Sequence, residues 1–194
     1  MGNIEINQKG AMSKLIIVCG LSGSGKTTLA EAVSRELGVV CLHKDSIKER
    51  LYDAMGLATL EDSKRLGVWT IELLMGLVEE QIARGVDVMV EAPFKFPEDY
   101  AEFERWSTEY GVQIYSIICE VDNEERYRRY VSRIDSGQRH HAHHDAERVQ
   151  IEKFHDDHDY AAIPGARLCL DTSEPLEKLV QKVVAHVGGQ ALRQ

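Results

Sequence analysis

Short apolar runs alternate along the chain with longer segments in which apolar residues recur at helical spacing. The apolar runs predict five buried strands, at residues 15–19, 39–42, 86–90, 112–119 and 167–170. The spaced segments predict helices at residues 26–37, 46–54, 60–84, 98–110, 123–135 and 175–186, with one more helix ending near residue 160. Strands that alternate with helices build a parallel sheet that is covered on both faces. The pattern therefore predicts an α/β three-layer sandwich with a five-stranded parallel sheet.

The length of 194 residues suits one core domain with a small inserted lid. We expect residues 1–13 to be a flexible lead-in, residues 14–187 to be the domain, and residues 188–194 to be a tail. Within the domain, residues 137–145 read GQRHHAHHD, which is polar and shows no apolar period. This segment is expected to be a loop or mobile lid, and the lid as a whole to span about residues 126–150.

A glycine-rich segment lies between the first predicted strand and the helix that follows it. Its sequence, GLSGSGKT, matches G-x-x-x-x-G-K-[ST] at every fixed position. The glycines let backbone N–H groups approach phosphate oxygens without obstruction by a Cβ atom. Lys26 can reach the β- and γ-phosphates of ATP, and Thr27 offers a hydroxyl to Mg²⁺. The predicted ATP site is formed by Gly20, Ser22, Gly23, Ser24, Gly25, Lys26, Thr27 and Thr28.

Composition and charge narrow the possible classes of function. The net charge is −9, whereas nucleic-acid binders usually carry a basic surface, so a nucleic-acid partner is disfavoured although a local basic groove is not excluded. No apolar segment is long enough to predict a transmembrane helix. The four cysteines lie in or beside predicted strands without C-x-x-C spacing, as expected of reduced core thiols in a cytoplasmic protein.

The phosphate-binding segment and the strands and helices around it resemble the P-loop kinases of the nucleoside-monophosphate-kinase type. Residues 14–187 look most like the small AAA-domain kinases, which include polynucleotide kinase, chloramphenicol phosphotransferase and zeta-toxin-like enzymes. The resemblance implies a P-loop NTPase fold with a helical lid. It also implies transfer of the γ-phosphate of ATP, with Mg²⁺, to a hydroxyl or phosphate of a small-molecule acceptor.

Two other functions stay open. One is a polynucleotide 5′-hydroxyl kinase, and the other is a nucleotide-binding ATPase module or switch without phosphotransfer. GTPase switches need an N-K-x-D motif to read the base, and the sequence has none. The sequence identifies neither the acceptor nor the oligomeric state.

Asp45 follows the second predicted strand, and ligands of open parallel sheets bind beyond the carboxyl ends of strands. In the resembling kinases an acidic residue here orients or deprotonates the acceptor hydroxyl. The alternative is a helix cap, but Ser46 and Glu49 match the capping box S-x-x-E, which would leave Asp45 free. The family's D-x-x-R pattern is D-x-x-K in this chain, so Lys48 offers the acceptor a point charge in place of a guanidinium fork.

Glu91 ends the third predicted strand. The resemblance places an acidic residue there, near Mg²⁺ or the acceptor, and the alternative is a carboxylate that faces solvent. Phe94 and Phe96 follow, and they either wall the acceptor pocket or pack in the core. Asp171 and Thr172 resemble the loop that packs beside the adenine, with a cap for the last helix as the alternative.

Arginines are concentrated on the helix predicted at residues 123–135, where Arg129 and Arg133 are four residues apart on one face. In the resembling kinases lid arginines clamp the transferring phosphoryl group, so both are expected to be catalytic. The alternative is ion pairing with acidic residues of the same helix. Arg139, in the histidine-rich segment, is a further candidate. A zinc site in that segment is an alternative to a lid, but the histidine spacing matches no common zinc signature.

Overall fold

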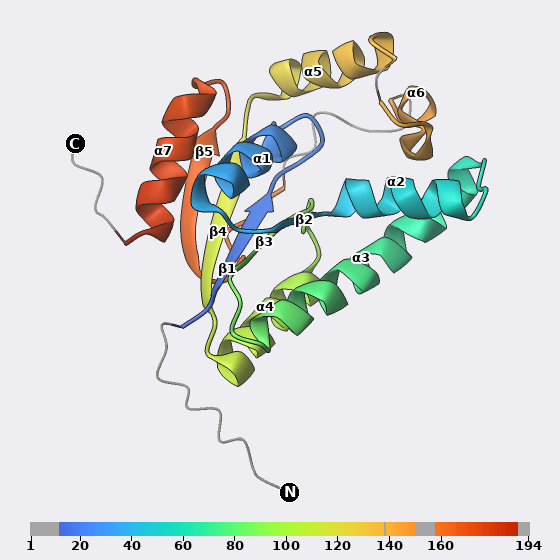
Figure 1. Cartoon of the computed structure of the whole chain (residues 1–194). Helices are drawn as coiled ribbons and strands as arrows, with labels where there is room; N and C mark the ends of the chain where they lie inside the picture. The colour runs from blue at the N-terminus through green and yellow to red at the C-terminus, as the bar shows by residue number, and fades with distance from the viewer. Residues whose placement is uncertain (1–11, 138, 150–157, 190–194) are drawn as a thin grey trace, which may run out of the picture.

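The computed structural model of the protein describes residues 12–137, 139–149 and 158–189 (Figure 1). Its strands are β1 (Lys14–Cys19), β2 (Cys41–His43), β3 (Val88–Glu91), β4 (Gln113–Glu120) and β5 (Ala166–Asp171). Its helices are α1 (Lys26–Leu37), α2 (Lys44–Ala54), α3 (Leu60–Ile82), α4 (Pro97–Tyr110), α5 (Asn123–Asp135), α6 (Asp145–Arg148) and α7 (Leu176–Val187), together with the 3-10 turn η1 (His141–His143). The five predicted strands and the six bounded helices are all confirmed, with ends that shift by one to a few residues.

The five strands form one parallel sheet in the order β2-β3-β1-β4-β5. The predicted fold class, an α/β sandwich with a five-stranded parallel sheet, is therefore confirmed. The chain leaves β1 toward one edge of the sheet and later returns to its other side, so the order of the strands reverses at β1. Open parallel sheets bind ligands at such a switch point, beyond the carboxyl ends of the strands.

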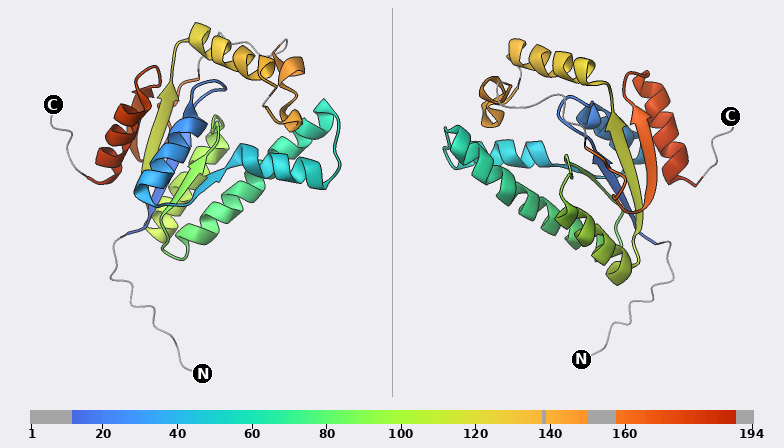
Figure 2. Two further views of the ribbon diagram at one scale, coloured as in Figure 1. Left: turned by 45° about the horizontal axis from the view of Figure 1, so that its top comes forward. Right: turned by 180° about the vertical axis from the view of Figure 1, so that it is seen from behind.

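Alternate residues of β1 anchor the two outer layers of the sandwich (Figure 2). Leu15 and Ile17 pack with apolar side chains of α3 and α4 on one face of the sheet. Ile16 and Val18 pack with side chains of α1 and α7 on the other face. Because β1 is buried on both faces, its sequence is apolar throughout rather than alternating. Among the described residues, no helix is long and apolar enough to cross a membrane.

Helix α2 begins two residues earlier than predicted. Its first residue is Lys44, and its N-cap, His43, makes no side-chain capping hydrogen bond. The predicted capping box of Ser46 and Glu49 is therefore wrong. The Glu49 carboxylate instead contacts His143 in the histidine-rich segment, with 2.7 Å between the two side chains. Long-range pairing has replaced the local cap.

The histidine-rich segment lies against the ends of α2 and α3 that extend beyond the sheet (Figure 1). Ala142 is fully buried there, in a small cluster with Tyr52 of α2 and Leu66 of α3. The predicted helix that ends near residue 160 falls mostly on residues outside the described ones, as do most of the lead-in and the tail.

Candidate active site

The phosphate loop connects β1 to α1 in a conformation that only glycine permits at two positions. Gly20 has φ +146°, and a Cβ atom there would lie 2.4 Å from the carbonyl oxygen of Cys119. Gly23 has φ +85°, and its Cβ would lie 2.5 Å from the carbonyl oxygen of Arg126. Gly25 is the N-cap of α1 and supplies no side chain to the first N–H groups of that helix. Those N–H groups are available to an anion.

A cavity of about 390 Å³ opens beside this loop. Lys26 and Thr27 line it from the start of α1, Asp45 from the start of α2, and Glu91 from the end of β3. These residues are far apart in the sequence, and the carboxyl edge of the sheet brings them together. The structure thus brings Lys26 and Thr27, with Ser22, into one cavity with both predicted acidic residues.

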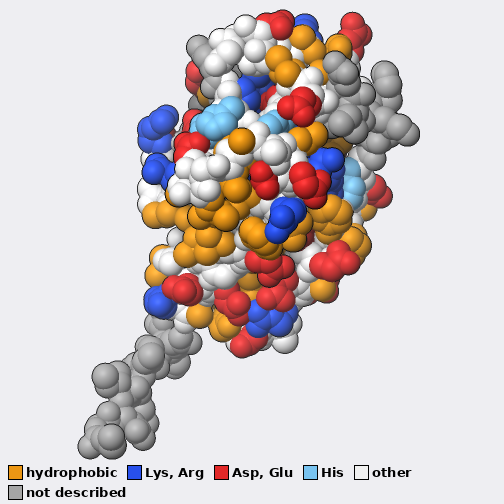
Figure 3. Space-filling model, turned by 90° about the vertical axis from the view of Figure 1, so that its right-hand side faces the viewer, with side chains coloured by type: hydrophobic (Ala, Val, Ile, Leu, Met, Phe, Trp, Pro, Cys, Tyr) orange, Lys and Arg blue, Asp and Glu red, His pale blue; other side chains and the backbone are white. Residues whose placement is uncertain are grey.

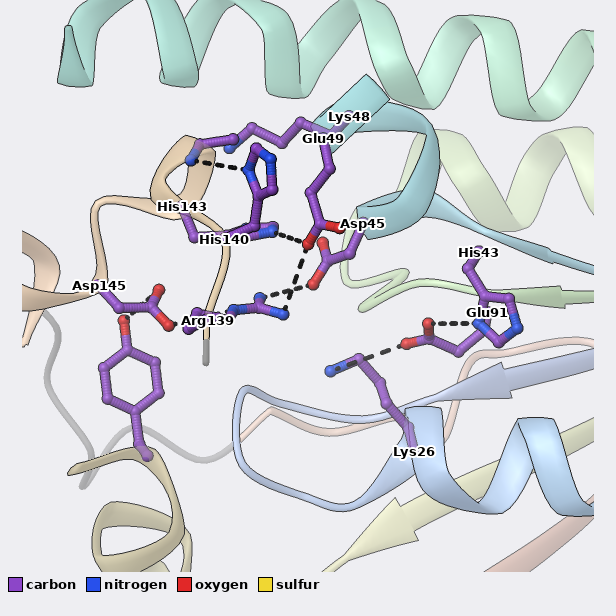
Figure 4. Close-up of polar contacts among 12 residues, drawn as sticks. Lys26, His43, Asp45, Lys48, Glu49, Glu91, Arg139, His140, His143 and Asp145 are labelled. Atoms are coloured by element: carbon purple, nitrogen blue, oxygen red, sulfur yellow. Dashed lines mark hydrogen bonds and ion pairs between the residues drawn. The ribbon is translucent and has the colours of Figure 1, made fainter. Parts of the chain in front are cut away.

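Glu91 lies between the side chains of Lys26 and His43 (Figure 4). Its side chain is almost fully buried, with its carboxylate 3.9 Å from Lys26 Nζ and 3.2 Å from His43 Nδ1. The hydrogen bond that Glu91 accepts from the ring raises the pKa of His43, and burial opposes that rise only in part. A carboxylate facing bulk solvent, the alternative for Glu91, is excluded by its burial.

His43 is a site residue that the sequence analysis did not find. It ends β2, and it is in register with Glu91 of the neighbouring β3. His43 could have been predicted from its position at the carboxyl end of a strand, where parallel strands bring side chains such as Glu91 together. Its ring fixes the Glu91 carboxylate from the side opposite Lys26.

Asp45 is held by Arg139 rather than by the helix terminus. Arg139 donates to Asp45 Oδ2 at 2.7 Å and to Asp145 Oδ2 at 3.2 Å. Burial raises the pKa of Asp45, but the electrostatic influence of His143, Arg139 and Lys26 outweighs it, so the pKa lies well below its usual range. Arg139 therefore contacts the predicted acceptor-activating carboxylate directly.

The two predicted clamp arginines occupy different places. Arg133 lines the cavity, lies 5.2 Å from the Tyr130 ring centroid, and has a buried Nε without a hydrogen-bond partner among the described residues. Burial, reinforced by the charge of Arg139, lowers the pKa of Arg133. Arg129 is outside the cavity, where it donates to Thr172 Oγ1 at 3.0 Å and to the Thr172 carbonyl at 3.1 Å. The structure therefore brings Arg133, and not Arg129, to the cavity.

The loop after β5 contacts the phosphate loop, and its predicted place beside the adenine stays a prediction. Thr172 Oγ1 donates to the carbonyl oxygen of Ser24 at 2.8 Å and lies next to Gly25 and Thr28. Asp171 accepts from the N–H of Ser173 at 2.9 Å, so it caps this turn. Helix α7 itself has no side-chain cap.

Of the two phenylalanines, only Phe96 reaches the cavity. Phe96 is 61% exposed, whereas Phe94 is 2% exposed and packs edge-to-face on Phe103 in the core. The prediction that Phe94 lines the acceptor pocket is therefore not met, and the core alternative applies.

The histidine-rich segment offers one group of potential metal ligands. Side-chain atoms of Asp53, His140 and His141 lie within 4.8 Å of one another. However, His140 Nδ1 accepts the N–H of Ala142, which leaves the proton of a neutral ring on Nε2, the atom that faces Asp53. A metal would need that Nε2 atom deprotonated, so this hydrogen bond disfavours a metal.

Known proteins share both the sequence pattern and the fold. The family profile described as AAA domain matches residues 15–159. A Chloroflexus aurantiacus J-10-fl protein assigned as a kinase is 28% identical, with a TM-score of 0.78 over 91% of this chain and 99% of that one. No curated protein matches the chain.

Two solved kinases of lower identity share the fold. The APS kinase CysC of Mycobacterium tuberculosis, solved with AMPPNP and APS, is 19% identical with a TM-score of 0.62, over 92% of this chain and 99% of that one. A gluconokinase from Sinorhizobium meliloti 1021 is 14% identical with a TM-score of 0.54, over 91% of this chain and 92% of that one.

Proposed function

Starting from the fact that the chain belongs to the AAA domain family, we propose that it is an ATP-dependent kinase with a small-molecule acceptor. The observation that carries this proposal is the single cavity in which Lys26 and Thr27 of the phosphate loop meet Asp45 and Glu91. Phosphate-binding and acceptor-activating groups on one cavity wall are what direct phosphoryl transfer requires.

In the proposed reaction, the acceptor oxygen forms a bond to the γ-phosphorus while the bond from that phosphorus to the bridging oxygen breaks and ADP leaves. The N–H groups of the phosphate loop and Lys26 hold the β- and γ-phosphates. Arg133, with no acidic partner among the described residues, faces the same cavity and stabilises charge on the transferring group.

Asp45 orients the acceptor hydroxyl and receives its proton. Because the pKa of Asp45 is held low, the carboxylate is ionised at neutral pH and ready to accept a hydrogen bond. Arg139 must first release Asp45, since its guanidinium occupies one carboxylate oxygen at 2.7 Å. Binding of the acceptor is thereby coupled to a movement of the histidine-rich segment.

The hydroxyl of Thr27 and the carboxylate of Glu91 form an oxygen donor set that suits Mg²⁺. These two residues would hold Mg²⁺ bound with ATP, which would neutralise charge on the β- and γ-phosphates. His43 keeps the Glu91 carboxylate in place when Lys26 turns from Glu91 to the nucleotide.

We also propose that residues 126–137 and 139–149 act as a lid over this site. Arg133 and Arg139 reach the cavity from this part of the chain, and Asp145 joins them there. A lid that carries the charged groups would exclude water when it closes on the substrates.

The test is incubation of the protein with Mg²⁺ and γ-labelled ATP against a panel of aminoglycoside, chloramphenicol, nucleoside and sugar acceptors and a 5′-hydroxyl oligonucleotide. We expect label to pass to a small molecule. ATP hydrolysis without transfer would point to an ATPase module instead. On the face seen in Figure 3, basic side chains are scattered among acidic ones without a continuous basic surface, which favours the small molecule over the oligonucleotide.

A further inference from the structure

Positive charge is concentrated in the cavity although the chain as a whole is acidic. Eight Lys and Arg side chains line the cavity against four Asp and Glu side chains. Besides Lys26 of the phosphate loop and three arginines, these cations include four lysines: Lys44, Lys48, Lys64 and Lys95. Within the described ranges, no carboxylate forms an ion pair with any of the four. The acceptor end of the cavity therefore has an excess of positive charge.

Lys48 is the most unusual member of this group, because it is a charged side chain that is only 3% exposed. Its ammonium donates to Ser63 Oγ at 2.7 Å, and Ser63 in turn donates to the Ala142 carbonyl at 2.6 Å. A buried cation with only a neutral partner is costly. Burial, together with the charges of Arg148 and Lys44, lowers the pKa of Lys48 to about 8.

Lys44 and Lys48 are four residues apart in the first turns of α2, so they lie on the same face of the helix. Burial lowers the pKa of Lys44 as well. Asp45 stands beside them, and the positive end of the α2 helix dipole adds to their field. Val68, Ile71 and Phe96 add apolar surface to the lining of the cavity.

We infer that Lys44 and Lys48 bind an oxyanion of the acceptor, so that the substrate is a small molecule bearing a phosphate, sulfate or carboxylate group in addition to the hydroxyl that is phosphorylated. This inference rests on the proposed kinase function for the identity of the acceptor. An oxyanion would satisfy the free donors of both ammonium groups, and Asp45 would lie close enough to receive the hydroxyl. Two lysines, as point charges, accept tetrahedral and planar oxyanions alike.

The test measures binding of sulfate to the full chain by calorimetry at pH 7. Because the phosphate loop is itself an anion site, the measurement is made twice: on wild-type protein saturated with Mg·AMPPNP, and on Lys26→Ala without nucleotide. The second arm does not depend on nucleotide binding. Inorganic phosphate and acetate are titrated in parallel, to separate a preference for tetrahedral oxyanions from one for carboxylates.

We expect one sulfate to bind to the protein saturated with Mg·AMPPNP, and sulfate to bind to Lys26→Ala as well. Lys48→Met should weaken this binding by at least about tenfold, with Lys44→Met as the second variant should Lys48→Met not fold. Lys48→Arg should retain binding. Lys178→Met, which removes an exposed lysine of α7 paired with Glu174, is the matched control and should leave it unchanged.

The inference is overturned if sulfate, phosphate and acetate all fail to bind in either arm, or if the lysine variants bind as tightly as the parent. These results are distinct from failure of the proposed function, which would show as absent binding of Mg·AMPPNP by the wild-type protein. Tighter binding of sulfate and phosphate would indicate a phosphorylated or sulfated acceptor, and tighter binding of acetate a carboxylic acid.

Discussion

Replacing Lys48 by Met should stabilise the protein while impairing its function. The pKa of Lys48 falls from 10.5 to about 8, and a fall of this size corresponds to about 3 kcal/mol of unfavourable free energy for the charged form in the folded state. Water that enters the cavity reduces this cost, and the lost hydrogen bond to Ser63 removes about 1 kcal/mol of stabilisation. We therefore expect a net gain of about 1–2 kcal/mol, or about 2–8 °C in Tm for a domain of this size.

The pH dependence of the free energy of unfolding tests whether the buried Lys48 ammonium destabilises the fold more directly than the Tm alone. Between about pH 8 and 10 the unfolded wild-type chain keeps the Lys48 proton that the folded chain has lost, so wild-type stability rises with pH. The variant lacks this titration, and its advantage at pH 7 should shrink toward pH 10. Lys64→Met, which removes an exposed lysine from the same cavity, is the control and should change Tm little.

Urea unfolding at pH 7 and pH 10 measures the free energy of unfolding of each protein and its change with pH. If Lys48→Met is less stable than the wild type by the same amount at the two pH values, the ammonium group stabilises the fold, and the account of an unsatisfied buried charge is wrong.

Three further results are expected. Asp45→Asn should bind Mg·AMPPNP normally but lose about 10²–10⁴-fold in kcat, while Glu36→Gln on the exposed face of α1 should be active; unchanged turnover in Asp45→Asn would remove Asp45 from the chemistry. Arg133→Ala should lower kcat by at least about tenfold, whereas Arg128→Ala, which removes an exposed arginine paired with Glu125, should not; equal effects would assign both to the surface. Hydrogen exchange in residues 139–149 should slow when Mg·AMPPNP binds, together with exchange in the phosphate loop; protection confined to the phosphate loop would contradict the lid.

Local patterns in the sequence predicted the fold and the phosphate loop of the site. The apolar run of β1, the glycine-rich turn and the lysine after it are contiguous, so their spacing alone defines a phosphate loop. The position of Asp45 followed from a general property of parallel sheets, whose carboxyl strand ends meet at one edge, and that of Glu91 was implied by the resemblance to P-loop kinases. Both residues indeed line the cavity with Lys26.

The remaining features depend on contacts between distant segments, which single-sequence patterns do not encode. The histidine-rich segment shows no apolar period, yet Ala142 is fully buried and the Arg139 side chain reaches Asp45. Helix α2 starts at Lys44, and Glu49 contacts the distant His143 instead of capping the helix. Arg129 and Arg133 lie on the same helix, but Arg129 is hydrogen-bonded to Thr172 in the loop after β5, outside the cavity.

The most direct test of the central claim is calorimetric binding of Mg·AMPPNP to the wild-type protein and to Lys26→Ala, with circular dichroism to show that both are folded. Lys26 meets the phosphates in the proposed site, and loss of one charge-assisted contact weakens binding by at least about tenfold. We predict that one Mg·AMPPNP binds per wild-type chain and that Lys26→Ala binds it at least about tenfold more weakly. Equal affinity of the two folded proteins would contradict it.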